Sequence, residues 1–136
     1  MMGTLTVVFT EPLHHICLMQ GLKHTFKQMP FLNKKVLEIG GRVVTMDSMV
    51  APPPMMRRAT RVSPNRKLRT IVEVSYWRER LTVEYRDDMC SASEAEAFLR
   101  TLVQDYHQVR YPFMKSEFRE NRYVEPATGH LLAEIS

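Results

Sequence analysis

The segment that most constrains the fold of this chain is "TIVEVSYWRERLTVEY", residues 70–85, in which apolar and polar side chains alternate on both sides of a charged centre. If Trp77 to Arg80 form a loop, the flanking runs become the two strands of an antiparallel hairpin. Its inward-facing residues then form three cross-strand pairs, Tyr76 with Leu81, Val74 with Val83, and Val72 with Tyr85. A slip of one residue would break all three pairs, so the pattern predicts both the hairpin and its register.

The other face of this hairpin is polar. It carries Glu73, Ser75, Thr82, Glu84 and Arg86. An antiparallel sheet with one apolar and one polar face is typical of a sheet covered on one side by helices.

The N-terminal part of the chain predicts a strand followed by a helix. Residues 4–9, "TLTVVF", alternate like a half-buried strand. Thr10 is expected to cap a helix with Pro12 in its first turn, and Pro30 to end it after Met29. The apolar residues of this predicted helix recur at helical spacing, at Ile16, Leu18, Met19, Leu22, Phe26 and Met29. Gly21 weakens the middle of the helix, where a kink is expected.

A second helix is predicted in "CSASEAEAFLRTLVQDYHQV", residues 90–109. Its start carries a capping box, either Ser91 with Glu94 or Ser93 with Glu96. One apolar stripe follows, made of Ala95, Phe98, Leu99, Leu102, Val103 and Tyr106.

Two further segments are predicted from turn signals. "KKVLEIGGRVVTM", residues 34–46, has short apolar runs around Gly40-Gly41 and predicts a hairpin. The tail at 111–136 is predicted to be irregular, with a turn at residues 125–130 and a short strand at 131–135.

The order of elements is therefore strand, helix, hairpin, basic arm, hairpin, helix. This order predicts a single α+β domain spanning residues 1–136, with an antiparallel sheet of about four to five strands packed on two helices. A chain of 136 residues is the usual length of one domain.

The basic arm is an extended, Pro- and Arg-rich segment at residues 50–69. Its six basic residues are Arg57, Arg58, Arg61, Arg66, Lys67 and Arg69. The chain has a net charge of +4, and removing these six from its 19 basic residues leaves 13 against 15 acidic residues. The positive charge of the chain thus belongs to the arm, and Pro52, Pro53, Pro54 and Pro64 favour an extended backbone there.

Several roles for the arm are consistent with these residues. Guanidinium groups match phosphate oxygens, so the arm could follow RNA or DNA, or it could contact an acidic surface of a protein partner. It could also fold back on its own domain, with Met55 and Met56 as apolar contacts and Glu73 and Glu84 as acidic ones, or remain a solvated loop.

Two other segments combine aromatic and basic residues. Trp77 lies at the hairpin tip between Arg78 and Arg80, where it either contacts a partner or folds over the sheet edge. The tail carries the basic residues Lys115, Arg119 and Arg122 among the aromatic residues Tyr111, Phe113, Phe118 and Tyr123. We therefore predict Trp77, Arg78, Arg80, Arg119 and Arg122, with the six basic residues of the arm, as residues that bind a partner or nucleic acid.

No catalytic, cofactor-binding or metal-binding residues are predicted, and no cofactor is expected. His14, His15, Cys17 and His24 are close in sequence, but they lack the second pair of ligands that a structural zinc site requires. Cys90 precedes a helix, yet Asp87 and Asp88 oppose a lowered thiol pKa there. Phosphate-binding loops and nucleophile motifs are absent from the sequence.

The sequence also indicates where the chain works. It contains no apolar run of the roughly 18 residues that a membrane span needs, and its N-terminus lacks the features of a signal peptide. Its two cysteines are too few for a disulfide framework. An intracellular, reducing compartment is expected, cytoplasmic or nuclear rather than organellar.

Together these features favour a non-enzymatic interaction module, a subunit or adaptor of a larger protein or ribonucleoprotein assembly that contacts protein partners through the arm, the Trp77 tip and the tail. The alternative is an RNA- or DNA-binding protein that uses the arm for phosphate contacts, and a small enzyme is a third. Homodimerisation through an exposed sheet edge is also consistent with the predicted sheet.

Overall fold

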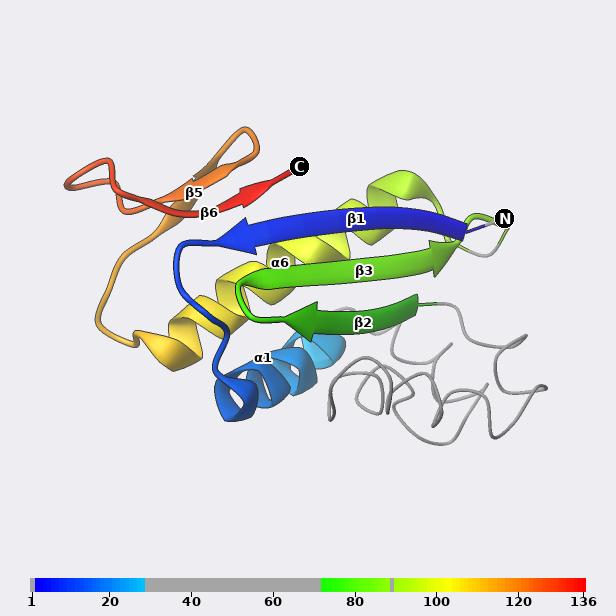
Figure 1. The fold of residues 1–136 in the computed structure, drawn as a ribbon, viewed down its shortest axis with the longest axis horizontal. Coiled ribbons are helices and arrows are strands. Elements are labelled where there is room, and N and C mark those ends of the chain that lie inside the picture. The colour runs from blue at the N-terminus through cyan, green and yellow to red at the C-terminus, as the bar shows by residue number, and fades with distance from the viewer. Residues whose placement is uncertain (1, 29–71, 89) are drawn as a thin grey trace.

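The computed structural model describes residues 2–28, 72–88 and 90–136 of the chain (Figure 1). These residues form an α+β domain with two helices and a six-stranded antiparallel sheet, which confirms the predicted fold class. The elements are β1 Met2–Phe9, α1 His15–Gln28, β2 Val72–Trp77, β3 Arg80–Arg86, α6 Ala92–Arg110, β4 Glu117–Arg119, β5 Arg122–Val124 and β6 Leu131–Ile135. The predicted hairpin at 34–46 and the basic arm at 50–69 lie outside the described residues.

The β2–β3 hairpin has the predicted register. Val72 lies opposite Tyr85, Val74 opposite Val83, and Tyr76 opposite Leu81. Five of these six side chains are buried, and Tyr76 is half-buried. The loop is tighter than the four residues predicted, because Trp77 and Arg80 also pair and leave a turn of two residues.

The sheet has the strand order β2-β3-β1-β6-β5-β4. β1 pairs with β3 from Met2 to Val8 and with β6 from Val7 to Phe9. The N-terminal strand therefore joins the β2–β3 hairpin to the three strands of the tail, as Figure 1 shows.

Helix α6 packs against one face of the sheet, behind β1 and β3 in Figure 1. All six residues of its predicted apolar stripe are buried. Its start has the predicted capping box, in which the Glu94 N–H donates to Ser91 Oγ and the Ser91 N–H donates to Glu94 Oε1.

Helix α1 begins later than predicted, at His15. The expectation that Thr10 caps it is wrong, because the Thr10 N–H donates to the Leu132 carbonyl oxygen at 3.2 Å and Thr10 thus continues the β1–β6 pairing. The expectation that Ile16 faces the core is also wrong, since its side chain is 61% exposed. The face of α1 toward α6 is set by other residues, namely Leu18, Gly21, Leu22 and Thr25.

Gly21 allows the two helices to approach closely. A Cβ atom built at Gly21 would lie 2.9 Å from both the backbone nitrogen and the Cα of Tyr106. Since backbone atoms cannot move aside as a side chain can, the packing of α1 on α6 requires glycine at this position.

The tail is more regular than predicted, because residues 111–136 contribute three strands instead of one. Strands of three residues, such as β4 and β5, are too short to show an alternating pattern in sequence. Tertiary contacts fix them: the Arg100 guanidinium of α6 donates to the Glu120 carbonyl oxygen at 2.7 Å and to Asn121 Oδ1 at 3.1 Å.

We predict that Gly21→Ala destabilises the protein. Helix propensity alone would make this change favourable by up to ~1 kcal/mol. The clash with the Tyr106 backbone should outweigh that gain and lower the free energy of unfolding by about 1–3 kcal/mol. Urea denaturation followed by circular dichroism measures the difference.

The matched control is Gln20→Ala, an exposed position on the same helix. It should change the free energy of unfolding by no more than about 0.5 kcal/mol. If Gly21→Ala were neutral or stabilising, the close packing of α1 on α6 would be wrong.

Candidate functional site

Six residues form a continuous row across the sheet on the face away from α6. Adjacent members lie directly opposite each other on neighbouring strands, in the order Trp77, Arg80, Val8, Glu134, Arg122 and Arg119. We call this set the cross-sheet row. With strands ~4.8 Å apart, it extends for roughly 24 Å.

The period of a β-strand places these six side chains on the face of the sheet away from α6, which no helix of the described residues covers and which we call the open face. Their sequence neighbours Val7, Phe9, Leu81, Tyr123 and Ala133 are buried on the helix side. In the row itself Val8 is half-buried, and the other five side chains are exposed. The next row contains hydroxyl side chains, with Ser75 opposite Thr82 and Thr82 opposite Thr6.

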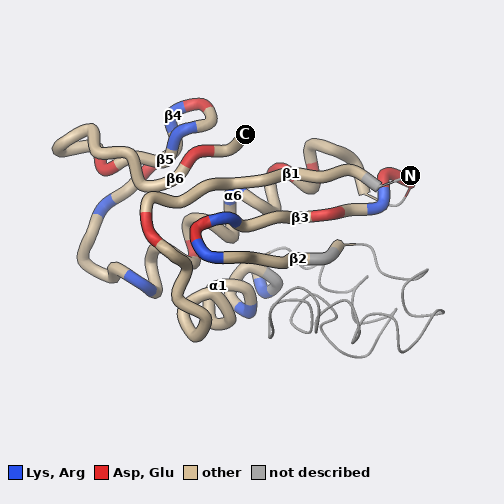
Figure 2. Tube along the Cα trace, viewed as in Figure 1, with Lys and Arg blue, Asp and Glu red and all other residues tan. Residues whose placement is uncertain are grey.

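The cross-sheet row has an alternating charge pattern. Arg80 lies toward one end and Arg122 and Arg119 at the other, with Glu134 between them. Figure 2 shows basic residues at the β2–β3 turn and on the β4–β5 hairpin, separated by an acidic residue of β6. Within the described part of the chain, Arg80, Arg122 and Glu134 form no ion pair, so their charges are available to a binding partner.

Two backbone hydrogen bonds hold the turn beside Trp77. The carbonyl oxygens of Arg78 and Glu79 accept the N–H groups of Leu13 and Phe9 at 2.9 and 2.8 Å, which joins the turn to the end of β1 and to the segment after it. Trp77 is 52% exposed, and the Arg78 guanidinium carbon lies 5.5 Å from its ring centroid. About half of the Trp77 side chain is thus exposed at the hairpin tip, and Arg78 lies over its ring.

Arg78 has an unfavourable backbone conformation. Its φ is 56°, in the left-handed region, where a residue with a Cβ atom costs ~1–2 kcal/mol relative to the right-handed region. Glu120 in the two-residue β4–β5 turn has the same φ of 56°, and two-residue hairpin turns favour a positive φ at their central residues. The backbone conformation of Arg78 therefore follows from the tightness of its turn.

At the other end of the row, two like charges lie side by side, which lowers the stability of the sheet. Arg119 lies directly opposite Arg122, and like charges in such a pair destabilise a sheet. Arg119 is partly compensated by Glu117, whose Oε2 lies 3.0 Å from its Nε, although both side chains are about half exposed. A pair of arginines on one face can bind an anionic group between them.

The structure brings together only part of the predicted site. Trp77, Arg78, Arg80, Arg119 and Arg122 lie on or beside the cross-sheet row. The basic residues of the arm lie outside the described residues. They are Arg57, Arg58, Arg61, Arg66, Lys67 and Arg69.

The aromatic residues of the tail serve different purposes. Tyr123 is 2% exposed and belongs to the core, and Phe118 is half-buried beneath the Arg100 guanidinium carbon, 4.7 Å from its ring centroid. Phe113 is 99% exposed in the segment after α6. Of the tail aromatics, Phe113 thus has the exposure expected of a contact residue.

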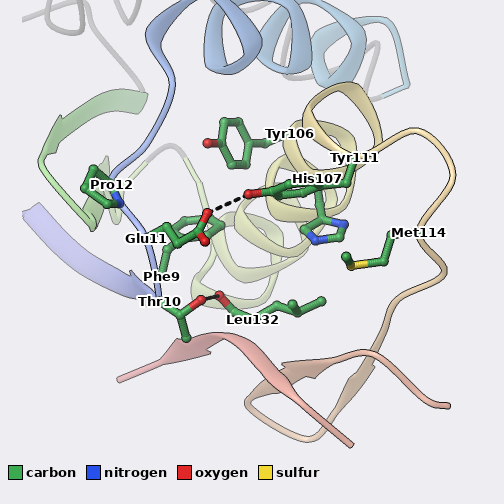
Figure 3. A pocket seen from close by; sticks show the side chains of 9 residues that line it. All are labelled: Phe9, Thr10, Glu11, Pro12, Tyr106, His107, Tyr111, Met114 and Leu132. Carbon is green, nitrogen blue, oxygen red and sulfur yellow. Dashed lines mark hydrogen bonds between the residues drawn. The ribbon is translucent and has the colours of Figure 1, made fainter. Parts of the chain in front are cut away.

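A second group of polar residues surrounds a cavity at the end of the sheet (Figure 3). This cavity has a volume of ≈ 160 Å³ and lies between the segment after β1, the end of α6 and the tail. The His107 side chain in its wall is 3% exposed. Its Nδ1 lies 3.3 Å from Ser116 Oγ, and Ser116 Oγ lies 2.5 Å from the Tyr123 hydroxyl oxygen.

The other nitrogen of His107 is unusual. Nε2 is buried and has no hydrogen-bond partner among the described residues. Burial lowers the pKa of His107 from its ordinary value of 6.5, against an opposing effect of Glu125, so the imidazole is neutral at pH 7.

Two tyrosines of the cavity wall have hydrogen-bond partners. The Tyr111 hydroxyl donates to Glu11 Oε2 at 2.6 Å, and this bond to a carboxylate is the main reason why the pKa of Tyr111 is raised. The Tyr106 hydroxyl oxygen accepts the His14 N–H at 2.9 Å, and burial raises the pKa of Tyr106.

The sequence reasoning missed His107, Val8 and Glu134. For His107 a signal was present, because it follows Val103 by four residues and so lies on the flank of the apolar stripe of α6. Val8 and Glu134 carry no comparable signal, since their place in the row depends on pairing between the two ends of the chain.

Comparison with protein-family models, with curated proteins and with solved structures finds no match for this chain.

We predict that His107 makes the protein less stable in acid. Because its folded pKa is lowered, both folded and unfolded states hold a neutral imidazole well above pH 6.5, and no penalty arises there. As the pH falls below 6.5 the unfolded state binds a proton first, so stability is lost until the folded pKa is passed.

Urea denaturation between pH 7.5 and 5 measures this loss. His107→Phe should flatten the pH dependence, whereas His130→Phe, which removes an exposed histidine, should leave it unchanged. An identical pH dependence in all three proteins would exclude a buried, neutral His107.

Proposed function

We propose that this chain is a non-enzymatic interaction module that binds a protein partner through the cross-sheet row. The observation that carries the proposal is the charge pattern of the row, with arginines toward both ends and Glu134 between them. Trp77 acts as the aromatic anchor of the interface, because exposed tryptophans and arginines are the residues that most often dominate binding energy.

The charge pattern favours a protein over a nucleic acid. A phosphate backbone is negative throughout and would be repelled where Glu134 lies. A protein partner can present acidic, basic and acidic side chains in turn and so complement the whole row. Within the row itself, Trp77 is the one aromatic side chain, so successive bases would lack the stacking surface that single strands usually find.

The size of the open face fits this proposal. The six strands contain 8, 6, 7, 3, 3 and 5 residues, which at ~3.3 Å per residue and ~4.8 Å between strands give an area on the order of 500 Å². This area is close to the ~600 Å² that each partner contributes to the smaller, transient protein interfaces. The hydroxyl row beside the cross-sheet row adds hydrogen-bonding groups that an interface rim requires.

The basic arm remains a predicted second contact. In sequence, the arm with its six basic residues directly precedes β2, the edge strand that carries Trp77. RNA- or DNA-binding through the arm is the alternative function, and the experiments below separate it from the proposed one.

We predict that Trp77→Ala and the double change Arg119→Glu with Arg122→Glu each weaken partner binding at least tenfold. Tryptophan and arginine side chains that dominate the binding energy of an interface typically cost ~2 kcal/mol or more when removed, which corresponds to roughly thirtyfold. Quantitative pull-down with the full chain, followed by mass spectrometry and titration of the recovered partner, gives the affinities.

Lys23→Glu is the matched control, because it reverses an exposed charge on α1, the other side of the domain. It should leave binding unchanged. Loss of binding in Lys23→Glu to the same extent, or full binding by both open-face variants, would contradict the proposal.

We further predict that Glu134→Lys distinguishes the two classes of partner. This change makes every charge in the row positive. It should therefore weaken binding of a protein with complementary charges at least fivefold, because the introduced lysine would then face a basic side chain of the partner. It should strengthen any binding to a single-stranded oligonucleotide, which is followed by fluorescence anisotropy across a salt series. Stronger oligonucleotide binding together with no recovered protein partner would favour the nucleic-acid function instead.

A further inference from the structure

We propose that the cross-sheet row binds the same row of a second copy of this chain, related to the first by a two-fold axis through Val8. This inference rests on the proposed function, since it names the partner of the same surface. The order of the row carries it, because Arg80 and Glu134 lie directly opposite Val8 on its two neighbouring strands, β3 and β6. Val8 therefore lies midway between a positive and a negative charge.

The two-fold axis is parallel to β1 and lies between the two facing sheets. Rotation about it reverses the order of the strands and keeps each residue at its own level along the strand, so the two rows face each other. Val8 then faces Val8 of the second copy. Arg80 faces Glu134 of the second copy, and Glu134 faces Arg80 of the second copy. The same ion pair thus forms twice, as in any interface in which one surface patch binds itself.

The next strands outward continue the match. Trp77 of β2 lies two strands from β1 on one side, and Arg122 of β5 lies two strands from it on the other. The rotation brings the Arg122 guanidinium to the Trp77 ring of the second copy, where it makes a cation–π contact. Trp77 is 52% exposed, so part of its surface is accessible beside Arg78. Arg119 lies one strand further out, beyond β2 of the second copy.

Other two-fold arrangements of the row bring like charges together. An axis on β3 makes Arg80 face its own copy, and an axis on β6 does the same for Glu134. An axis midway between β1 and β6 makes Arg80 face Arg122, and one midway between β1 and β3 leaves Arg80 opposite the uncharged Val8. An axis along the row makes every arginine face an arginine. Since like charges in contact oppose binding, Val8 is the position that the charges favour.

The hydroxyl row beside the cross-sheet row fits the same axis. Thr6 precedes Val8 by two residues on β1 and so lies on the same face, where it also faces its own copy. Ser136 directly follows β6, and its N–H donates to the Thr6 carbonyl oxygen at 2.9 Å. The rotation places Ser136 opposite Thr82 of the second copy. A hydroxyl group both donates and accepts hydrogen bonds, so these side chains can pair across the axis.

The geometry of packed sheets sets the strength of the dimer. Facing sheets lie ~10 Å apart, with their strands within about 30° of each other, so the contacts are closest near the axis. Strands β2, β3, β1, β6 and β5 of each copy overlap over an area on the order of 400 Å². Interfaces of this size form weak, transient complexes, and we expect a Kd of ~10–100 μM.

Exchange of the paired charges tests the axis. Arg80→Glu places two carboxylates opposite each other at both ion pairs, and Glu134→Arg places two guanidinium groups there. Each variant alone should dimerise at least tenfold more weakly than the wild type. An equimolar mixture of the two variants should regain a Kd within about threefold of the wild-type value, because each variant supplies the charge that the other lacks. Analytical ultracentrifugation of the full chain from ~1 μM to ~1 mM measures these constants.

Lys23→Glu is the control for a reversed charge on α1, and it should dimerise as the wild type does. Recovery of the dimer in the mixture also shows that both variants fold. NMR of the ¹⁵N-labelled wild type needs no variant. With increasing concentration, the Trp77 indole N–H and the amides of Arg80 and Glu134 should shift, whereas the Lys23 amide should not.

The second copy is the wrong partner if the wild type stays monomeric up to ~1 mM, if either single change leaves the dimer intact, or if the mixture stays monomeric. It is also wrong if the wild-type amides of the row do not shift with concentration. The pull-down with Trp77→Ala then decides the proposed function separately. A different protein that is recovered by the wild type and lost in Trp77→Ala would keep the cross-sheet row as a binding surface. The absence of any such protein would reject both proposals.

Discussion

The pairing of β1 with both β3 and β6 is the interaction on which the rest of the structure depends. It joins the N-terminal strand to a hairpin from the middle of the chain on one side and to the C-terminal strand on the other. Val8 is where the two ladders meet on the open face, opposite Arg80 and opposite Glu134. A slip of one residue in either ladder would turn half of the cross-sheet row toward the helices, where charged side chains would have to be buried. The burial of Val7 and Phe9 thus fixes the register of β1 with its neighbours, and this register determines which charged residues lie next to each other on the other face.

The sequence predicted those parts of the fold that are encoded locally. The register of the β2–β3 hairpin follows from three apolar pairs within sixteen residues, and α6 follows from a capping box and a continuous apolar stripe. The predicted start of α1 was wrong because Thr10 forms a backbone hydrogen bond with Leu132 of β6, a strand at the other end of the sequence. The strands β4 and β5 were missed because three residues cannot show a period, and it is Arg100, together with pairing to β6, that holds them in place.

In the candidate site, too, the sequence predicted local features and missed those that depend on pairing between distant segments. Sequence composition selected Trp77, Arg80, Arg119 and Arg122, because aromatic and basic residues stand out in exposed segments. It could not show that they form one row, since the row is completed through Val8, which pairs with Arg80 from the middle of the chain and with Glu134 from the C-terminal strand. Glu134 was overlooked because a single acidic residue in an alternating strand is ordinary. Its position between the arginines is what turns a basic surface into a pattern of alternating charge.

The two faces of the sheet have different roles: the helix face contributes most of the stability, and the open face is the proposed binding surface. The helix face is filled by buried apolar side chains, which supply most of the free energy of folding through removal of apolar surface from water. The open face carries the opposed arginines of the β4–β5 hairpin, a pair that opposes folding by up to ~1 kcal/mol, which a core of this size can offset. Because this pair adds nothing to the core, we attribute it to the contacts proposed for the open face, where its alternation with Glu134 would give selectivity among partners more than affinity for any charged surface.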